Sequence, residues 1–158
     1  MRSLSVKEIV PECVYQRAQF YDFPAELKKS ELERLGIGCV VCLIPKYDRD
    51  LCWLQDRYVH IPIPDGRVSE GCSALLLENA CRVGKWIDDG VKALVHCRAG
   101  RNRSSLFSAL LAVRSLGLTG AQSVDYLREK RPRALDNDHF ERFLRSLHGY
   151  KKGIGYIF

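Results

Sequence analysis

Residues 96–105 read HCRAGRNRSS, and this stretch decides the fold because of the segments on either side of it. The segment before it, residues 92–95, is short, largely apolar and partly β-branched, which predicts a buried strand. The segment after it, residues 106–113, is apolar almost all round, which predicts a buried helix. The ten residues between the two segments therefore form a turn from a strand into a helix.

This turn has the features of an anion-binding loop. Consecutive backbone N–H groups in such a turn converge on a negative ion, and the start of the following helix adds the positive end of its dipole. Gly100 permits the bend, and the same field favours Cys97 as a thiolate, the nucleophilic form of cysteine. Arg103 carries a planar guanidinium that binds two phosphate oxygens at once. The spacing therefore predicts a phosphate site beside a nucleophile.

Two further residues complete the expected catalytic set of Cys97, Arg103, Asp65 and Ser104. Ser104 offers a hydroxyl that can hydrogen-bond the sulfur and help it leave in a second step. Departure of an ester oxygen from phosphate needs a proton, which a carboxylic acid on a second loop supplies before it acts as a base on water. Asp65 follows a strand of the same sheet, so its loop should reach the same rim as Cys97. The alternative is that Asp65-Gly66 forms only a turn.

The other residues of the loop have supporting roles. We expect His96, on the buried strand, to hydrogen-bond the loop backbone rather than to act as a mobile base, and Asn102 to be structural. The side chains of Arg98 and Arg101 are expected to point out of the loop, towards whatever carries the phosphate. Five residues are predicted to contact the substrate: Arg98, Ala99, Gly100, Arg101 and Asn102.

The stretch resembles the signature of the cysteine-dependent protein phosphatases, His-Cys-x5-Arg-Ser/Thr, and every fixed position of that signature is filled. The likeness is greatest to the small, atypical dual-specificity phosphatases, and it extends from about Ile9 to Tyr150. Residues 58–65 resemble the strand that leads to the general-acid loop of that family. The run Arg131-Pro132, followed by Asn137 and Phe140, resembles the last turn and helix of the family.

The resemblance implies hydrolysis of phosphotyrosine, and of phosphoserine or phosphothreonine, on proteins through a phosphocysteine, with no metal or other cofactor. Two enzyme alternatives stay open. Arg98 and Arg101 occupy the variable positions at which phosphoinositide-directed relatives carry basic residues, so an anionic lipid phosphate is a second substrate class. Asn102 before Arg103 is similar to the RNA 5′-triphosphatase branch, although that branch lacks the acid that Asp65 provides. A non-enzymatic alternative is a phosphate-binding pseudophosphatase.

Composition limits the class of protein. At 158 residues the chain fits a single domain, with a core over about residues 9–150 and a tail over residues 151–158 that carries no interpretable signal. Its seven cysteines are an odd number, and no apolar segment follows Met1-Arg2-Ser3, so we expect a reducing, cytoplasmic environment. No run approaches the roughly 18 apolar residues of a membrane span. The sequence gives no indication of oligomeric state.

Charge is distributed unevenly between the two halves. Residues 1–79 contain 10 Lys and Arg against 12 Asp and Glu, whereas residues 80–158 contain 15 against 7. The half that contains the phosphate loop therefore has a net charge of +8, which would concentrate anionic substrates. A solvated surface that only aids solubility is the alternative, and no DNA partner is expected.

The order of the predicted elements indicates an α/β fold. We expect strands within residues 9–18, 37–44, 58–63 and 92–95, and helices over about 24–35, 73–88, 106–116, 119–130 and 137–147, with a polar loop at 46–50. This alternation predicts a central, mostly parallel, twisted sheet of about four to five strands flanked by helices on both faces. The anion-binding loop should then lie at the carboxyl ends of the strands.

The pair Cys39 and Cys42 has the spacing of a zinc or redox site. The two cysteines lie within a predicted strand, however, where residues three apart point to opposite faces, and no second Cys-x2-Cys completes a set of four ligands. We interpret both as core residues. A disulfide from Cys39 or Cys42 to Cys97 under oxidation is left open, because some relatives have such a partner.

Overall fold

The computed structural model describes residues 3–158 and is built around a five-stranded sheet with the order β1-β2-β5-β3-β4. The strands are β1 (Lys7–Val10), β2 (Val14–Arg17), β3 (Ile37–Cys42), β4 (Tyr58–His60) and β5 (Lys92–His96). Only β1 pairs with its neighbour in the antiparallel sense, and the other pairs are parallel. The predicted mostly parallel sheet is therefore confirmed. Met1 and Arg2, which the predicted single domain includes, lie outside the described residues.

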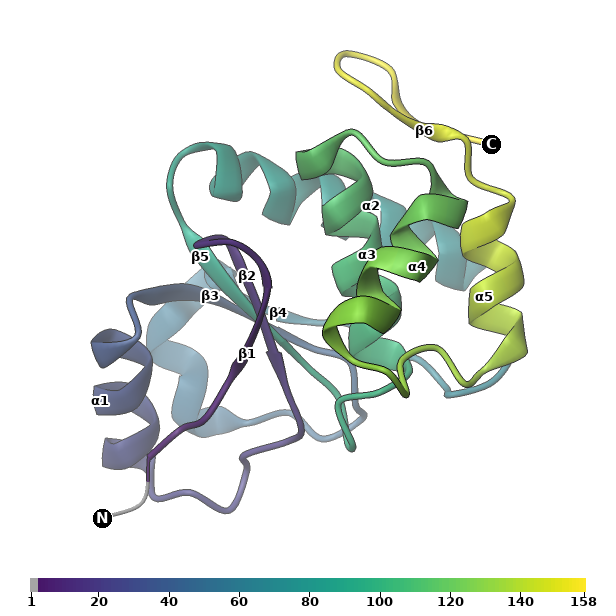
Figure 1. Ribbon diagram of the computed structural model, residues 1–158. Coiled ribbons are helices and arrows are strands. Elements are labelled where there is room, and N and C mark those ends of the chain that lie inside the picture. Colours follow the sequence, from purple (N-terminus) through teal and green to yellow (C-terminus); the bar gives the residue numbers. More distant parts are fainter. Residues whose placement is uncertain (1–2) are drawn as a thin grey trace.

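Helices cover both faces of the sheet, as the alternation of elements predicted. They are α1 (Ala25–Arg34), the 3-10 helix η1 (Arg49–Arg57), α2 (Glu70–Asp88), α3 (Arg103–Leu116), α4 (Gly120–Lys130) and α5 (Asp138–Arg145). Figure 1 shows α1 on one side of the strands and α3, α4 and α5 on the other. Within residues 3–158 no single helix has the length and hydropathy to cross a membrane. Helices α3 and α4 taken together reach that length and hydropathy, but they are bent by 115° relative to each other.

Two buried clusters result from the alternation of side chains along the strands. Cys39 and Val41 of β3 pack with α2, α3, α4 and α5, whereas Val40 and Cys42 face α1 and η1. The two cysteines therefore point to opposite faces and belong to the core, as expected. All seven cysteines of the chain are unpaired.

Capping residues set the ends of the helices. Gly117 ends α3 with a left-handed φ of 68°, and Thr119 begins α4 with a capping box in which Gln122 takes part. Asn137 caps α5 by accepting hydrogen bonds from the backbone of the first turn. Ser69 caps α2, so this helix begins about one turn before the predicted start at residue 73.

Two segments differ from the sequence-based expectation. The polar loop predicted at residues 46–50 runs into η1, because Leu51 and Leu54 are buried and draw this segment onto the sheet. The tail forms a hairpin of β6 (Gly149–Lys151) and β7 (Gly155–Ile157). The Tyr156 hydroxyl fixes the hairpin by donating to the backbone oxygen of Leu110, at 2.7 Å. Strands of three residues are too short for periodicity to reveal.

Candidate active site

The predicted anion-binding loop lies at the carboxyl end of β5, the central strand, and leads into α3. Cys97 follows β5 directly and is only 2% exposed. Its Sγ lies 3.3 Å from the hydroxyl oxygen of Ser104, a fully buried residue in the first turn of α3. The predicted nucleophile and the hydroxyl that was expected to assist it are thus in contact.

Three hydrogen-bond donors from outside the catalytic loop, residues 97–103, hold three of its carbonyl groups on the outer side of the loop. The contacts are Gln19 N to Arg98 O (3.2 Å), Gln16 Nε2 to Gly100 O (2.9 Å) and Leu135 N to Arg101 O (3.1 Å). In a trans peptide the carbonyl and the next N–H point in opposite directions. The N–H groups of residues 99, 101 and 102 therefore face the inside of the loop. None of the three makes a hydrogen bond within the described part of the chain, so they are available to an anion.

Gly100 and Gln16 hold the loop against β2. Gly100 has a φ of 71°, and a Cβ atom there would lie 2.8 Å from the backbone carbon of Arg17, so only glycine fits. Gln16 is fully buried and also donates to the Ser105 hydroxyl at 2.9 Å. Sequence reasoning missed Gln16. The available signal was its place two residues after Val14, on the buried side of a strand, where a polar side chain needs partners.

Arg103 is the first residue of α3 and is partly buried. Its Nη1 atom donates to the Ile63 carbonyl at 3.3 Å, and its Nε atom is buried without a partner among residues 3–158. Those residues also offer it no ion pair. The positive charge of Arg103 is therefore left unneutralised beside the inward N–H groups.

Asp65 reaches the rim of the catalytic loop. Its carboxylate accepts a hydrogen bond from Asn102 Nδ2 at 3.1 Å and another from Asn137 Nδ2 at 2.8 Å. Asn137 also joins the loop directly, since its backbone N–H donates to Asn102 Oδ1 at 3.2 Å. The Asp65 side chain thus bonds to distant segments, and a simple turn does not account for its position. Asn102 links the loop to neighbouring segments, in keeping with the structural role expected for it.

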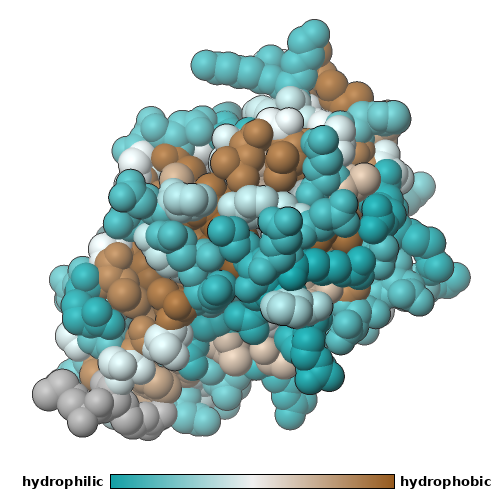
Figure 2. Space-filling view, viewed as in Figure 1, coloured by the Kyte–Doolittle hydropathy of each residue, from teal (hydrophilic) through white to brown (hydrophobic). Residues whose placement is uncertain are grey.

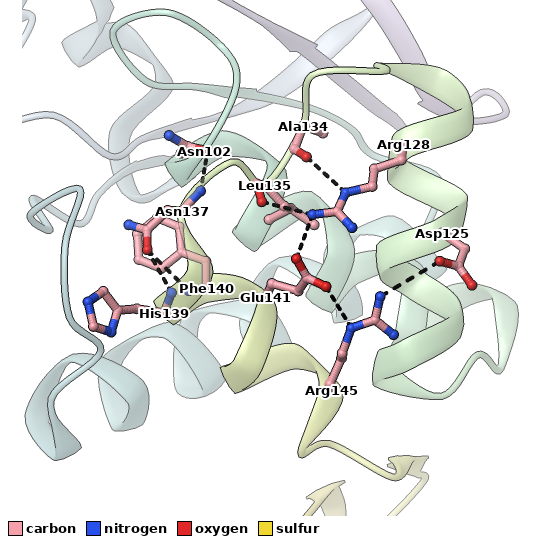
Figure 3. Close-up of polar contacts among 10 residues, drawn as sticks. All are labelled: Asn102, Asp125, Arg128, Ala134, Leu135, Asn137, His139, Phe140, Glu141 and Arg145. Atoms are coloured by element: carbon pink, nitrogen blue, oxygen red, sulfur yellow. Dashed lines mark hydrogen bonds and ion pairs between the residues drawn. The ribbon is translucent and has the colours of Figure 1, made fainter.

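A clamp positions Asn137, and sequence reasoning did not foresee it (Figure 3). Arg128 of α4 donates to the carbonyl oxygens of Ala134 and Leu135 and forms an ion pair with Glu141 at 2.7 Å. Leu135, with a left-handed φ of 62°, is thereby held in a strained conformation. Arg128, and after it Arg145, lower the pKa of Glu141 to about 2. The segment that carries Asn137 is therefore fixed by a charged network.

His96 is a buried, neutral residue. Burial lowers the pKa of His96 to about 4. Its ring contacts the edge of Phe20, with 5.1 Å between the ring centroids. The Nδ1 atom of His96 is buried without a partner among residues 3–158, so the expected hydrogen bond to the loop backbone stays a prediction.

Comparison with known proteins places this site in a family. The catalytic-domain model of the dual specificity phosphatases matches residues 19–149, which is most of the chain. The chain belongs to the dual specificity phosphatase family. A search of curated proteins with this chain finds no match.

Solved structures share the fold of this dual specificity phosphatase. Tk-PTP in its active form is 27% identical, with a TM-score of 0.69 over 90% of this chain and 95% of that chain. The PTP-2 phosphatase of Cydia pomonella is 17% identical, with a TM-score of 0.70 over 96% of each chain. Human DUSP28 is 19% identical, with a TM-score of 0.67 over 92% of this chain and 95% of that chain. The last two likenesses show the fold alone.

The two variable arginines of this dual specificity phosphatase lie on different sides of the loop. Arg98 lines a hollow of about 760 Å³ together with Arg103, and we name it the substrate hollow. Its other lining residues are Gln19, Tyr21, Asp22, Ile44, Pro45 and Lys46. Arg101 lines a separate hollow of about 260 Å³ beside the end of α4. The two side chains therefore line different hollows, and the expectation that both point towards whatever carries the phosphate stays a prediction.

Proposed function

We propose that this dual specificity phosphatase hydrolyses phosphotyrosine, and in addition phosphoserine and phosphothreonine, on proteins through a phosphocysteine at Cys97. One observation carries the proposal: the loop that begins at Cys97 contains three inward N–H groups and ends at the unneutralised Arg103. Such a cradle stabilises the charge on the three equatorial oxygens of a transferring phosphoryl group. The reaction needs a free thiol, which supports a cytoplasmic location.

In the first step the Cys97 thiolate attacks phosphorus, and the bond from phosphorus to the ester oxygen breaks. Protonated Asp65 gives its proton to the departing oxygen, so the alcohol or phenol leaves neutral and Asp65 becomes a carboxylate. The amides of Asn102 and Asn137 hold that carboxylate at the rim of the loop. Arg103 grips two phosphoryl oxygens throughout the step.

In the second step water attacks the phosphocysteine, Asp65 takes a proton from the water, and the bond between sulfur and phosphorus breaks. The sulfur leaves as a thiolate, and the Ser104 hydroxyl, 3.3 Å from Sγ, donates a hydrogen bond to it. Inorganic phosphate is released, and Asp65 is protonated again for the next cycle. Every proton and electron pair is thus accounted for by the substrate, water and these side chains.

The substrate hollow supports an aromatic phosphoester. Tyr21, Ile44 and Pro45 present ring and aliphatic surface beside Arg98 and Arg103, an arrangement suited to the ring of phosphotyrosine. Lys46 in the same hollow favours a second candidate, a phosphoinositide headgroup, because Lys46 and Arg98 together would meet additional phosphates. Triphosphorylated RNA is a weaker candidate, since that branch of the superfamily works without the acid that Asp65 supplies.

Turnover of p-nitrophenyl phosphate tests the chemistry. The wild-type chain should hydrolyse it, vanadate should compete, a chelator should have no effect, and Cys97→Ser should abolish turnover because an alcohol is not ionised near neutral pH. Cys52→Ser, at an exposed cysteine, is the matched control and should behave as wild type. Appreciable activity in Cys97→Ser would remove the nucleophile assignment. Vanadate binding without turnover would instead show a phosphate-binding module.

A panel of phosphopeptides, phosphoinositides and triphosphorylated RNA tests the substrate class. We expect the highest kcat/KM for phosphotyrosine peptides. Arg98→Ala should lower kcat/KM more for a phosphoinositide than for p-nitrophenyl phosphate if the lipid is the substrate. A phosphoinositide turned over faster than every phosphopeptide would replace the protein proposal with the lipid one.

A further inference from the structure

A basic furrow lies beside the catalytic loop, separate from the substrate hollow. It consists of two hollows, of about 310 and 260 Å³, which share Lys7 of β1 and Arg131 at the end of α4 as lining residues. The basic furrow is defined by five side chains: Lys7, Arg101, Lys130, Arg131 and Arg133. It thus joins the catalytic loop to the edge strand of the sheet and to the segment after α4.

The charge of the basic furrow is almost unneutralised. Among residues 3–158 the one carboxylate within ion-pair distance of it is that of Asp136, 4.0 Å from Arg101, and the two side chains are 54% and 38% exposed, respectively. Lys7, Arg131 and Arg133 form no ion pair with the described residues. Like charges gathered in a hollow repel one another, and an anion bound there relieves that repulsion.

The basic furrow lies close to the phosphate site. Arg101 belongs to both, since it is a residue of the catalytic loop two positions before Arg103. Its carbonyl accepts from Leu135 N at 3.1 Å, which ties the loop to the segment that follows Arg133. An extended polypeptide advances about 3.3 Å per residue, so a chain whose phosphate occupies the loop would reach the furrow within a few residues.

We propose that the basic furrow binds an acidic segment of the protein substrate that flanks the phosphorylated residue. The proposal rests on the proposed phosphatase function and names the substrate class of the same site. The concave shape suits an extended chain rather than a flat bilayer. None of the large exposed hydrophobic side chains lines the furrow, so it offers nothing to insert into a membrane and no free ring for base stacking. In Figure 2 the surface over the segment after α4 is largely hydrophilic.

The test compares two phosphotyrosine peptides that differ only in a flanking run of glutamates or glutamines. Wild type should show a kcat/KM roughly tenfold higher for the glutamate peptide at low salt, a preference that shrinks as salt is added. Arg131→Glu combined with Arg133→Glu should reduce that preference to near unity. Turnover of p-nitrophenyl phosphate should stay within about twofold, because these side chains lie outside the loop.

The matched control is Lys151→Glu combined with Lys152→Glu, an equal change of charge in the exposed hairpin near the far end of α3. It should keep the preference for the glutamate peptide. Absence of a preference in wild type, or an equal loss of preference in the control, would overturn the proposal. A third result would also overturn it: the furrow variant keeps the peptide preference but binds phosphatidylserine vesicles or RNA more weakly. The occupant of the furrow would then be another polyanion.

A binding measurement separates this proposal from the proposed function. Cys97→Ser retains the furrow, so its affinity for the unphosphorylated glutamate peptide, followed by fluorescence anisotropy, does not depend on turnover. We expect the Arg131→Glu and Arg133→Glu changes, added to Cys97→Ser, to weaken that affinity roughly tenfold. If the chain binds the peptide but has no phosphatase activity, only the proposed function is contradicted. If the enzyme is active but its peptide affinity does not depend on the charges of the furrow, only the furrow proposal is contradicted.

Discussion

The charged side chains that join α1 to η1 and those of the active site differ in how far their charges are neutralised. Lys28 of α1 is fully buried, and its Nζ atom lies 2.7 Å from Asp48 Oδ2 and 3.0 Å from Asp50 Oδ2. The backbone N–H of Asp48 in turn donates to the Tyr58 hydroxyl at 2.9 Å. In this Lys28 cluster two carboxylates neutralise the charge of the one buried lysine, so the cluster serves the packing of α1 and η1.

In the active site no such neutralisation occurs within the described residues. Arg103 has no carboxylate partner, and Asp65 is held by two neutral amides rather than by a cation. Uncompensated charge of this kind lowers stability but stays available to a ligand or to a proton transfer. The difference lies in the partners of these side chains: carboxylates neutralise Lys28, whereas Arg103 has no carboxylate and stays available to an anion.

Loss of the acid should have the largest effect. Asp65→Asn removes the proton donor but can keep one amide contact, so we expect kcat for aryl phosphates with poor leaving groups to fall roughly 10²–10⁴-fold. The loss should shrink as the leaving group becomes more acidic, because such groups need little protonation. Equal losses across a leaving-group series would show that Asp65 is held at the rim for structure alone.

Removing either of two cations, the fully buried Lys28 or the partly buried Arg103, should separate stability from binding. Lys28→Met leaves two carboxylates without their cation and should lower the free energy of unfolding by about 3–5 kcal/mol, measured by urea denaturation. Arg103→Met should leave stability within about 1 kcal/mol of wild type yet weaken vanadate binding at least tenfold. If Arg103→Met destabilised the chain as much as Lys28→Met, the contrast between the two regions would disappear.

The neutral His96 should give a smaller, pH-dependent effect. Its pKa is lowered to about 4 in the folded chain, below the unfolded value of about 6.5, so between these limits the unfolded chain binds more protons. Stability should therefore fall by about 1–3 kcal/mol as the pH drops from 6.5 towards 4. His96→Gln should flatten that part of the profile. An unchanged slope would mean that other groups cause the loss.

The sequence was sufficient for the parts of the site that are local. The run from β5 through Cys97 to α3 carries its own spacing, and Asp65 follows a recognisable strand and turn. The helix caps Thr119 and Asn137 can also be predicted from the few residues that follow each of them. In each case the physical signal lies within one or two turns of the chain.

The parts that sequence could not provide depend on contacts between distant residues. Gln16 bonds to Gly100 across 84 positions, and Asn137 bonds to Asp65 across 72. The Lys28 cluster joins α1 to η1 across 20 positions, and a lysine on a helix gives no sign that it will be buried. The separation of Arg98 from Arg101 likewise follows from the anchoring of the loop by residues 19 and 135.

Trapping the covalent intermediate tests the central claim most directly. Wild-type enzyme mixed with excess p-nitrophenyl phosphate, denatured within the first turnover and digested, should yield the peptide that contains Cys97 with one phosphoryl group on sulfur. The amount should match the burst of p-nitrophenol, and Ser104→Ala should increase it by slowing release of the sulfur. A phosphoryl group on any other residue, or full turnover with none on Cys97, would contradict the mechanism.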